Sequence, residues 1–166
     1  MSQIVLKVNG TPFQVDLSPS DTLARVLRER LGFTDVKNGC ERGECGSCTV
    51  LIDGRAVVSC LMLAVKAEGR EITTARGLAQ GGRLHDLQRK FIEHDAIQCG
   101  YCTPGMLMSA KALLDTHPNP SEEEIRIAIS GNICRCTGYQ QIVEAIAAAA
   151  IEENPPTGCD RESADE

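Results

Sequence analysis

The chain has 166 residues, 42% of them hydrophobic and 3% aromatic, with a formal net charge of −6. That length fits one domain of ordinary size or two small ones. The negative charge argues against a nucleic-acid partner, because a phosphate backbone is bound by a basic face. No apolar run reaches the roughly 18–20 residues of a membrane span. No signal peptide is visible either, so we expect the protein in the cytoplasm.

The N-terminal part of the chain is predicted to be rich in strands. Residues 4–8 form a short apolar run, and apolar and polar residues alternate over 13–17, as in a half-buried strand. Asn9-Gly10 stands between them and favours a two-residue hairpin, because both residues tolerate a positive φ. The first two strands are therefore expected to pair.

A helix and a second hairpin are predicted next. Asp21 is a candidate N-cap, apolar residues follow at helical spacing over 23–31, and Gly32 is a stop signal. The apolar segments 49–52 and 56–58 flank Asp53-Gly54, another hairpin signal. Two hairpins with a helix between them indicate a β-grasp arrangement.

The second half of the chain is predicted to be helical. Its four expected helices cover 84–94, Pro104 to about 115, Ser121 to 129, and 139–151. Pro104 suits a first helical turn, and Ser121 with Glu124 forms a capping box. Four helices imply a small bundle. Residues 73–82 are expected to be the linker between the two halves, and the acidic segment 152–166 is expected to be disordered.

Eight of the nine cysteines fall into two groups of four. The first group has the spacing C-x4-C-x2-C-x11-C and consists of Cys40, Cys45, Cys48 and Cys60. The second has the spacing C-x2-C-x31-C-x-C and consists of Cys99, Cys102, Cys134 and Cys136. Four thiolates are what a [2Fe–2S] cluster needs, and C-x4-C-x2-C is the plant-type ferredoxin spacing. Two quartets therefore suggest two one-electron centres.

The surroundings of the two quartets differ. Gly39, Gly43 and Gly46 lie among the first three cysteines, where they allow tight turns and let backbone N–H groups point at the sulfurs. The second quartet precedes two predicted helix starts. Free N–H groups and the positive end of a helix dipole suit an anionic thiolate cluster. If the two helix starts meet, four sulfurs converge there.

Other metal and redox interpretations stay open on spacing alone. Structural zinc also uses sets of four cysteines, although neither group shows the two C-x2-C pairs that are usual in zinc ribbons. A disulfide framework would explain an even count, but the expected reducing compartment argues against it. Cys159 is expected to be a free thiol without a ligand role.

Three segments together resemble one known family. CERGECGSCTV, QCGYCTPGM and GNICRCTGY look like the small iron–sulfur subunit of the molybdenum hydroxylases, the xanthine oxidase and aldehyde oxidoreductase group. The likeness covers about residues 2–150. It implies an α+β chain with a β-grasp, plant-type ferredoxin-like domain over 1–76 and a four-helix-bundle domain over 77–151. Each domain would hold one [2Fe–2S] cluster.

The resemblance also implies how the subunit works. The quartet of Cys99, Cys102, Cys134 and Cys136 would lie nearer the molybdenum, and the quartet of Cys40, Cys45, Cys48 and Cys60 nearer the flavin. Gln98 and Cys136 match positions that contact the molybdopterin cofactor. The implied partners are a large molybdopterin-binding subunit and a medium FAD-binding subunit, assembled as a heterotrimer or its dimer.

The leading hypothesis is therefore an electron-transfer subunit of a heteromeric molybdenum hydroxylase. It would relay electrons between a molybdopterin centre on the large subunit and FAD or an external acceptor. The chain itself shows no nucleophile–base pair and no expected substrate-converting site. A free-standing two-cluster ferredoxin and a zinc-stabilised interaction module are the alternatives.

Overall fold

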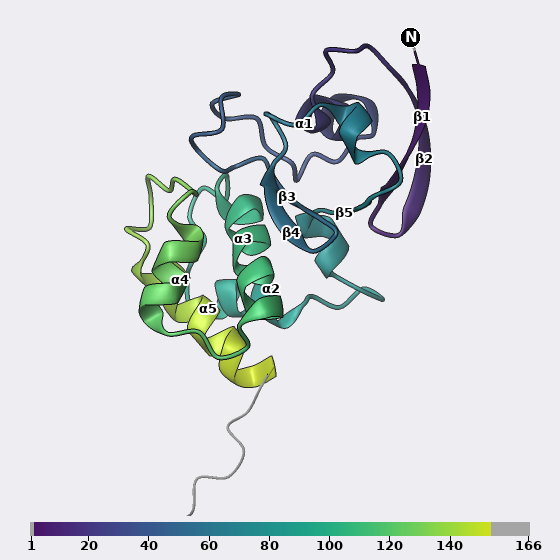
Figure 1. Ribbon diagram of the computed structural model, residues 1–166. Coiled ribbons are helices and arrows are strands. Elements are labelled where there is room, and N and C mark those ends of the chain that lie inside the picture. The colour runs from purple at the N-terminus through teal and green to yellow at the C-terminus, as the bar shows by residue number, and fades with distance from the viewer. Residues whose placement is uncertain (1, 154–166) are drawn as a thin grey trace, which may run out of the picture.

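The computed structural model describes residues 2–153 and has a mixed α+β fold (Figure 1). Its five-stranded sheet has the order β2-β1-β5-β3-β4. The strands are β1 (Ser2–Val8), β2 (Thr11–Leu17), β3 (Thr49–Ile52), β4 (Arg55–Val58) and β5 (Glu71–Thr73). Residues 154–166, which include Cys159 and most of the tail expected to be disordered, lie outside the described residues.

Both predicted hairpins are confirmed. β1 pairs antiparallel with β2, and β3 pairs antiparallel with β4. At the first turn Asn9 and Gly10 have φ angles of 51° and 78°, and at the second Asp53 and Gly54 have 49° and 80°. Positive φ at both turn residues matches the right-handed twist of the two strands.

The central strand β5 was absent from the sequence prediction. It pairs parallel with β1 and antiparallel with β3, and so joins the two hairpins into one sheet. The expected linker 73–82 is consequently not a plain connection. Its first residue belongs to β5, and residues Ala75–Leu78 form a 3-10 turn. The Asn9 side chain fastens this segment by hydrogen bonds to the N–H and hydroxyl of Thr74.

The helix after the first hairpin is short and irregular. α1 covers Leu23–Arg25 and continues as a π-helical turn over Val26–Arg30. The expected N-cap, Asp21, was wrong: Thr22 caps the helix by accepting the N–H of Arg25. Asp21 is 5% exposed and instead accepts hydrogen bonds from the Ser18 N–H and the Arg30 guanidinium. That ion pair ties the start of the helical segment to its end.

Strand β3 is buried on both faces. Val50 and Ile52 belong to the core that packs around α1, whereas Leu51 belongs to the core of the helical part. Figure 1 shows helix α3 (Thr103–Thr116) beside β3 and β4. A strand covered on both sides reads as a continuous apolar run, as Thr49–Ile52 does. Strand β3 therefore lies between the two hydrophobic cores of the molecule.

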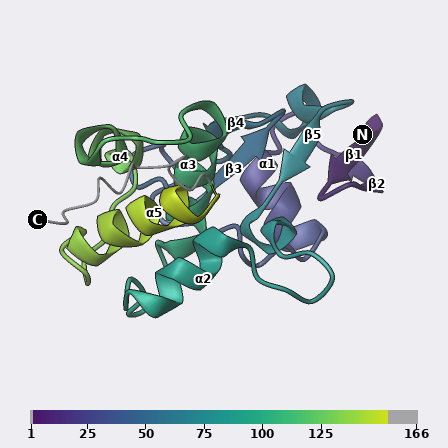
Figure 2. The same ribbon diagram turned by 90° about the horizontal axis from the view of Figure 1, so that it is seen from below.

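The second half consists of helices that pack together. Besides α3 they are α2 (Asp86–Glu93), α4 (Glu122–Ile129) and α5 (Gln140–Glu153). Figure 2 shows α5 running beside α2 and α4. The Ser121 capping box and the first-turn position of Pro104 are both present. Among the described residues, no helix has the length and apolar character needed to cross a bilayer.

Candidate metal centres

The first quartet lies at the edge of the sheet domain. Cys40, Cys45 and Cys48 sit in the long loop that leads into β3, and Cys60 follows directly after β4. The β3–β4 hairpin folds Cys60 back toward the loop. Cys48 and Cys60 are 3% and 6% exposed, while Cys40 and Cys45 are partly exposed. Most of this site is therefore enclosed by its own domain.

Backbone N–H groups of the loop surround the Cys40 sulfur. It accepts hydrogen bonds from the N–H groups of Arg42 at 3.5 Å, Glu44 at 3.3 Å and Cys45 at 3.4 Å. The loop can turn this tightly because Glu41 and Gly43 adopt φ angles of 55° and 81°. Donors aimed at a sulfur stabilise negative charge on it.

A close approach at Gly39 shapes the same loop. A Cβ at this position would lie 2.8 Å from both the Cys45 sulfur and the Ser47 hydroxyl oxygen. Any residue larger than glycine at position 39 would therefore displace these atoms. Ser47 Oγ and Cys45 Sγ are 3.1 Å apart, so the serine hydroxyl can donate to a thiolate there.

The thiols of the first quartet differ in acidity. Hydrogen bonds from the backbone N–H groups of Arg42 and Cys45 lower the pKa of Cys40 to about 6. Burial raises the pKa of Cys60 to about 11. Metal binding displaces thiol protons, so a cation at this site would bind the Cys40 thiolate readily and would have to displace a proton from Cys60.

The second quartet lies where two helices begin. Cys102 is the N-cap residue of α3, and Cys99 lies three residues before it; Cys134 and Cys136 precede α5. The structure brings the two helix starts together, with the sulfurs of Cys99 and Cys136 3.6 Å apart. Cys102 is 9% exposed, whereas Cys99 and Cys136 are exposed.

Threonine and tyrosine side chains hold the Cys134 segment. The Thr137 hydroxyl lies 3.1 Å from the Cys134 sulfur, which also accepts the Thr137 N–H at 3.5 Å. The Tyr139 hydroxyl accepts the Cys134 N–H at 2.9 Å. Tyr139 itself has a φ of 72°, a conformation unusual for a bulky residue. The loop is thus fastened from both sides of the cysteine.

Burial and hydrogen bonding also shift the pKa values of the thiols of the second quartet in different directions. Burial raises the pKa of Cys102 to about 12. At Cys134 burial raises the pKa, but the hydrogen bonds from Thr137 outweigh it, so that the pKa is lowered. The hydrogen bond to Cys99 raises the pKa of Cys136. Each quartet thus combines one acidic thiol with at least one buried thiol that resists ionisation.

The two quartets are joined directly. The N–H of Ile133, next to Cys134, donates to the carbonyl oxygen of Cys45 at 2.9 Å. The Asn132 amide donates to the carbonyl oxygen of the following residue, Gly46, at 3.0 Å. The Tyr101 hydroxyl, beside Cys102, donates to the Asn38 carbonyl at 2.7 Å. The loops that carry the two quartets therefore contact each other through three hydrogen bonds.

Exposed apolar residues lie within two positions of three cysteines of the second quartet. Ile97, Tyr101 and Ile133 are 39%, 47% and 57% exposed. Gln98 lies among them and is also exposed. An apolar rim around partly open sulfurs is typical of a surface that a partner covers.

The donor set of each quartet fits a [2Fe–2S] cluster. Four cysteines can supply four thiolates, and such a cluster takes two thiolates at each of two irons. N–H or hydroxyl groups also approach the sulfurs of Cys40, Cys45 and Cys134.

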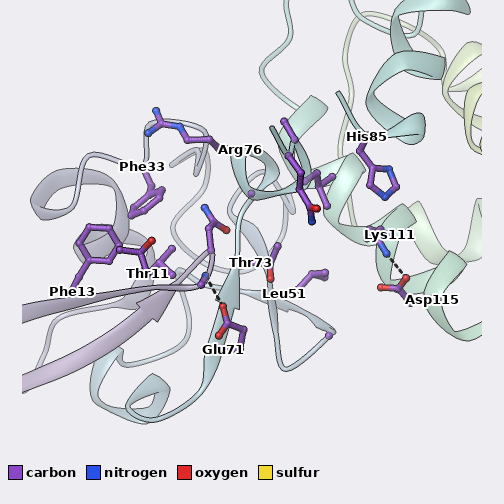
Figure 3. Close-up of a pocket in the computed structure, with 18 residues that line it drawn as sticks. Thr11, Phe13, Phe33, Leu51, Glu71, Thr73, Arg76, His85, Lys111 and Asp115 are labelled. Carbon is purple, nitrogen blue, oxygen red and sulfur yellow. Dashed lines mark hydrogen bonds and ion pairs between the residues drawn. The ribbon is translucent and has the colours of Figure 1, made fainter. Parts of the chain in front are cut away.

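A cavity of about 940 Å³ lies away from both quartets, between the β1–β2 turn, the linker and α3 (Figure 3). None of the eight cysteines within residues 2–153 lines it. Lys111 and Asp115 on α3 pair with each other at its edge, and Glu71 accepts the Gly10 N–H. These three charged side chains are thus engaged within the protein, and no pair of them forms a nucleophile with its base.

Several residues at the sites carried no separate sequence prediction. Asn132, Ser47 and Thr137 all lie inside the cysteine motifs, but their partners are fixed only by folding. A hydroxyl two or three residues after a cysteine is the signal that could have identified Ser47 and Thr137. Nothing local could identify Asn132, because Gly46 lies 86 residues away.

Comparison with known proteins agrees with the geometry. Residues 6–79 match a family described as a 2Fe-2S iron-sulfur cluster binding domain, and residues 74–147 match a [2Fe-2S] binding domain. The chain is 50% identical to the nicotinate dehydrogenase small FeS subunit of Eubacterium barkeri, over 86% of this chain and 91% of that protein. It is 49% identical to the xanthine dehydrogenase iron-sulfur-binding subunit of Escherichia coli O157:H7, over 84% and 88%.

A solved structure shows the same fold. The match is to quinoline 2-oxidoreductase from Pseudomonas putida 86, with a TM-score of 0.88, 50% identity, and coverage of 92% of this chain and 94% of that one. Both halves of the chain are included in these alignments, together with the segment that joins them. The chain belongs to the family of small iron–sulfur subunits of the molybdenum hydroxylases.

Proposed function

We propose that the two quartets each hold one [2Fe–2S] cluster. Cys40, Cys45, Cys48 and Cys60 would hold the first, in a ferredoxin-like domain of residues 1–76. Cys99, Cys102, Cys134 and Cys136 would hold the second, in a four-helix-bundle domain of residues 77–151. All eight thiols are free of disulfides, and N–H or hydroxyl groups approach the sulfurs of Cys40, Cys45 and Cys134.

As a member of this family, the chain is an electron-transfer subunit of an oxidoreductase complex. When bound, the two clusters supply one-electron chemistry between a molybdopterin centre on a large subunit and FAD or an external acceptor. The observation that carries this function is the direct hydrogen bond between the two cysteine loops, from Ile133 N–H to Cys45 carbonyl. This bond joins the loops that carry the two quartets, as electron exchange between two clusters requires.

The exposure of the second quartet supports its assignment as the one nearer the molybdopterin. Cys99 and Cys136 are exposed, and so is Gln98, which directly precedes Cys99. Gln98 and the surroundings of Cys136 would contact the molybdopterin held by the large subunit. The first quartet, more enclosed, would exchange electrons with the FAD-binding subunit. We place the heterotrimer, or its dimer, in the cytoplasm.

The first test is the metal itself. The purified full chain should be red-brown, contain about four irons, and show two distinguishable EPR signals after reduction. Colourless protein that contains zinc would contradict the proposal. Full electron-transfer activity of the isolated chain between diffusing proteins, with no large subunit, would favour a free-standing ferredoxin instead.

The second test is the partner surface. Ile133→Asp places a charge on the apolar rim and should weaken co-purification with a co-expressed large subunit, because burying an unpaired charge is costly. Val5→Asp is the matched control, since Val5 is 47% exposed on the far hairpin. Equal retention of the large subunit by both variants would contradict the placement of that surface.

A further inference from the structure

A buried asparagine lies between the two cysteine loops. Asn132 is 3% exposed and precedes Cys134 by two residues. Its amide nitrogen donates to the Gly46 carbonyl at 3.0 Å, and its amide oxygen accepts the Ser109 hydroxyl at 2.7 Å. One side chain therefore connects the first cysteine loop, helix α3 and the second cysteine loop.

The backbone on either side of Asn132 is fixed as well. Its own N–H donates to the Ile129 carbonyl at 2.8 Å, at the end of α4. The next N–H, of Ile133, donates to the Cys45 carbonyl at 2.9 Å. Asn132 and Ile133 thus engage two successive carbonyl groups of the first loop, Cys45 and Gly46. Two adjacent bonds fix both the distance and the orientation of the facing segments.

The contact is too close for any side chain to be added. A Cβ on Gly46, whose φ is 68°, would lie 2.3 Å from the Gly131 carbonyl oxygen and 2.6 Å from the Asn132 amide nitrogen. A Cβ on Gly105 in α3 would lie 2.3 Å from the Gly46 carbonyl oxygen. Glycine on both sides lets three backbone segments meet around the asparagine amide.

Satisfying the Gly46 carbonyl does not require Asn132. That oxygen also accepts the Thr49 N–H at 3.0 Å and the Thr49 hydroxyl at 2.7 Å. A carbonyl oxygen has two lone pairs, so its hydrogen-bonding capacity is met within its own loop. The asparagine bond is additional, and what it adds is a link between the two halves of the molecule.

We propose that Asn132 is a positioning residue that sets the separation between the two cysteine quartets. The proposal rests on the function proposed above, in which both quartets hold clusters. Asn132 touches no cysteine sulfur. It acts through the backbone, by holding the Cys45–Gly46 segment against the segment that carries Cys134. Loss of its amide leaves the Ile133–Cys45 and Tyr101–Asn38 hydrogen bonds between the loops and allows the Gly46 segment a range of separations from the Cys134 segment.

The experiment compares Asn132→Ala with Asn9→Ala in the full chain reconstituted with iron and sulfide. Asn9 also makes two side-chain hydrogen bonds, both to Thr74 and far from the cysteines. Its φ of 51° makes alanine strained there, so this control costs at least as much stability. The readouts are iron content, the EPR signal of each cluster, and the magnetic splitting between the clusters when both are reduced.

Asn132→Ala is expected to keep both clusters, with a weaker and broader splitting, because the dipolar interaction falls with the cube of the separation. Asn9→Ala should keep both clusters with the wild-type splitting. An unchanged splitting in an Asn132→Ala protein with both clusters would overturn the proposal.

Ser109→Ala covers the case in which Asn132→Ala loses iron. It removes the hydroxyl that orients the asparagine amide and leaves every residue of both cysteine loops intact. A partial loss of splitting supports the positioning role, and a wild-type splitting contradicts it. Failure of the proposed function itself looks different, because the wild-type chain would then lack the two iron signals altogether.

Discussion

The two sites bring four cysteines together with different parts of the backbone. The first is a tight loop whose own N–H groups surround the Cys40 sulfur, and a hairpin returns Cys60 to it. The second collects cysteines from two helix starts and holds Cys134 with the Thr137 side chain. The loop site is largely enclosed, whereas the helix site leaves Cys99 and Cys136 exposed. This difference in exposure supports the proposal that another subunit covers the second site.

Removal of one buried cysteine at each site is expected to have the largest effect. Cys48→Ala and Cys102→Ala should each lower the iron content from about four to about two per chain, since a [2Fe–2S] cluster needs four protein ligands. Each variant should lose a different one of the two EPR signals. Cys159→Ala, at the cysteine expected to have no ligand role, should keep all the iron. If either buried-cysteine variant retained both signals, the assignment of its quartet would be wrong.

The next largest effect is expected from a substitution at the contact between the two sites. Gly46→Ala should lower the free energy of unfolding by about 3–5 kcal/mol, because strain from the left-handed conformation adds to overpacking against Gly131. Gly10→Ala has a similar φ but nothing within 4 Å of the added Cβ, and should cost only about 1–2 kcal/mol. Urea denaturation of both variants measures the difference. Equal losses of unfolding free energy would show that the close contact between Gly46 and Gly131 does not add to the cost.

The acidity of the thiols predicts a pH dependence in iron-free protein. With its pKa lowered to about 6, Cys40 is mostly thiolate at neutral pH, and its alkylation rate should level off above about pH 7. Cys102, with a pKa raised to about 12, is protonated throughout this range, so its rate should stay low and rise with pH. Mass spectrometry of peptides alkylated between about pH 5 and pH 9 measures both rates. Similar profiles for the two cysteines would contradict the difference between a thiol that accepts backbone N–H groups and a buried thiol.

The smallest expected effects are on reduction potentials. A hydroxyl that donates to a ligand sulfur favours the more negative, reduced state, so its loss should lower the potential. Thr137→Val should lower the potential of the second cluster only, and Ser47→Ala that of the first only. A hydrogen bond of about 0.5–1.5 kcal/mol corresponds to about 20–60 mV for one electron. EPR-monitored titration resolves the two potentials, and a shift of the wrong cluster would refute the pairing.

Local signals predicted most of the fold. Asn9-Gly10, Asp53-Gly54 and the Ser121–Glu124 capping box identified two turns and a helix start, because each depends on neighbouring residues only. Strand β5 was missed because three residues are too few to show alternation, and its pairing depends on β1 and β3. Asp21 was misassigned as a cap because its ion pair with Arg30 forms only after the π-helical turn brings the two together.

The candidate sites were predictable in part for the same reason. The cysteine spacing is local, and it identified the eight thiols that the structure gathers into two groups. The link between the groups is not local: Asn132 and Ile133 reach Gly46 and Cys45 across most of the chain. The close approach that requires glycine at 46 and 105 is likewise a property of the packed molecule. Sequence motifs thus identified the candidate ligands, and only the structure shows how the loops that carry them contact each other.

A potentiometric titration of the full chain, followed by EPR, tests the central claim most directly. Two adjacent [2Fe–2S] sites predict two separable signals that appear in one-electron steps, with a magnetic splitting once both are reduced. A single signal with about two irons per chain, or zinc in place of iron, would contradict the account.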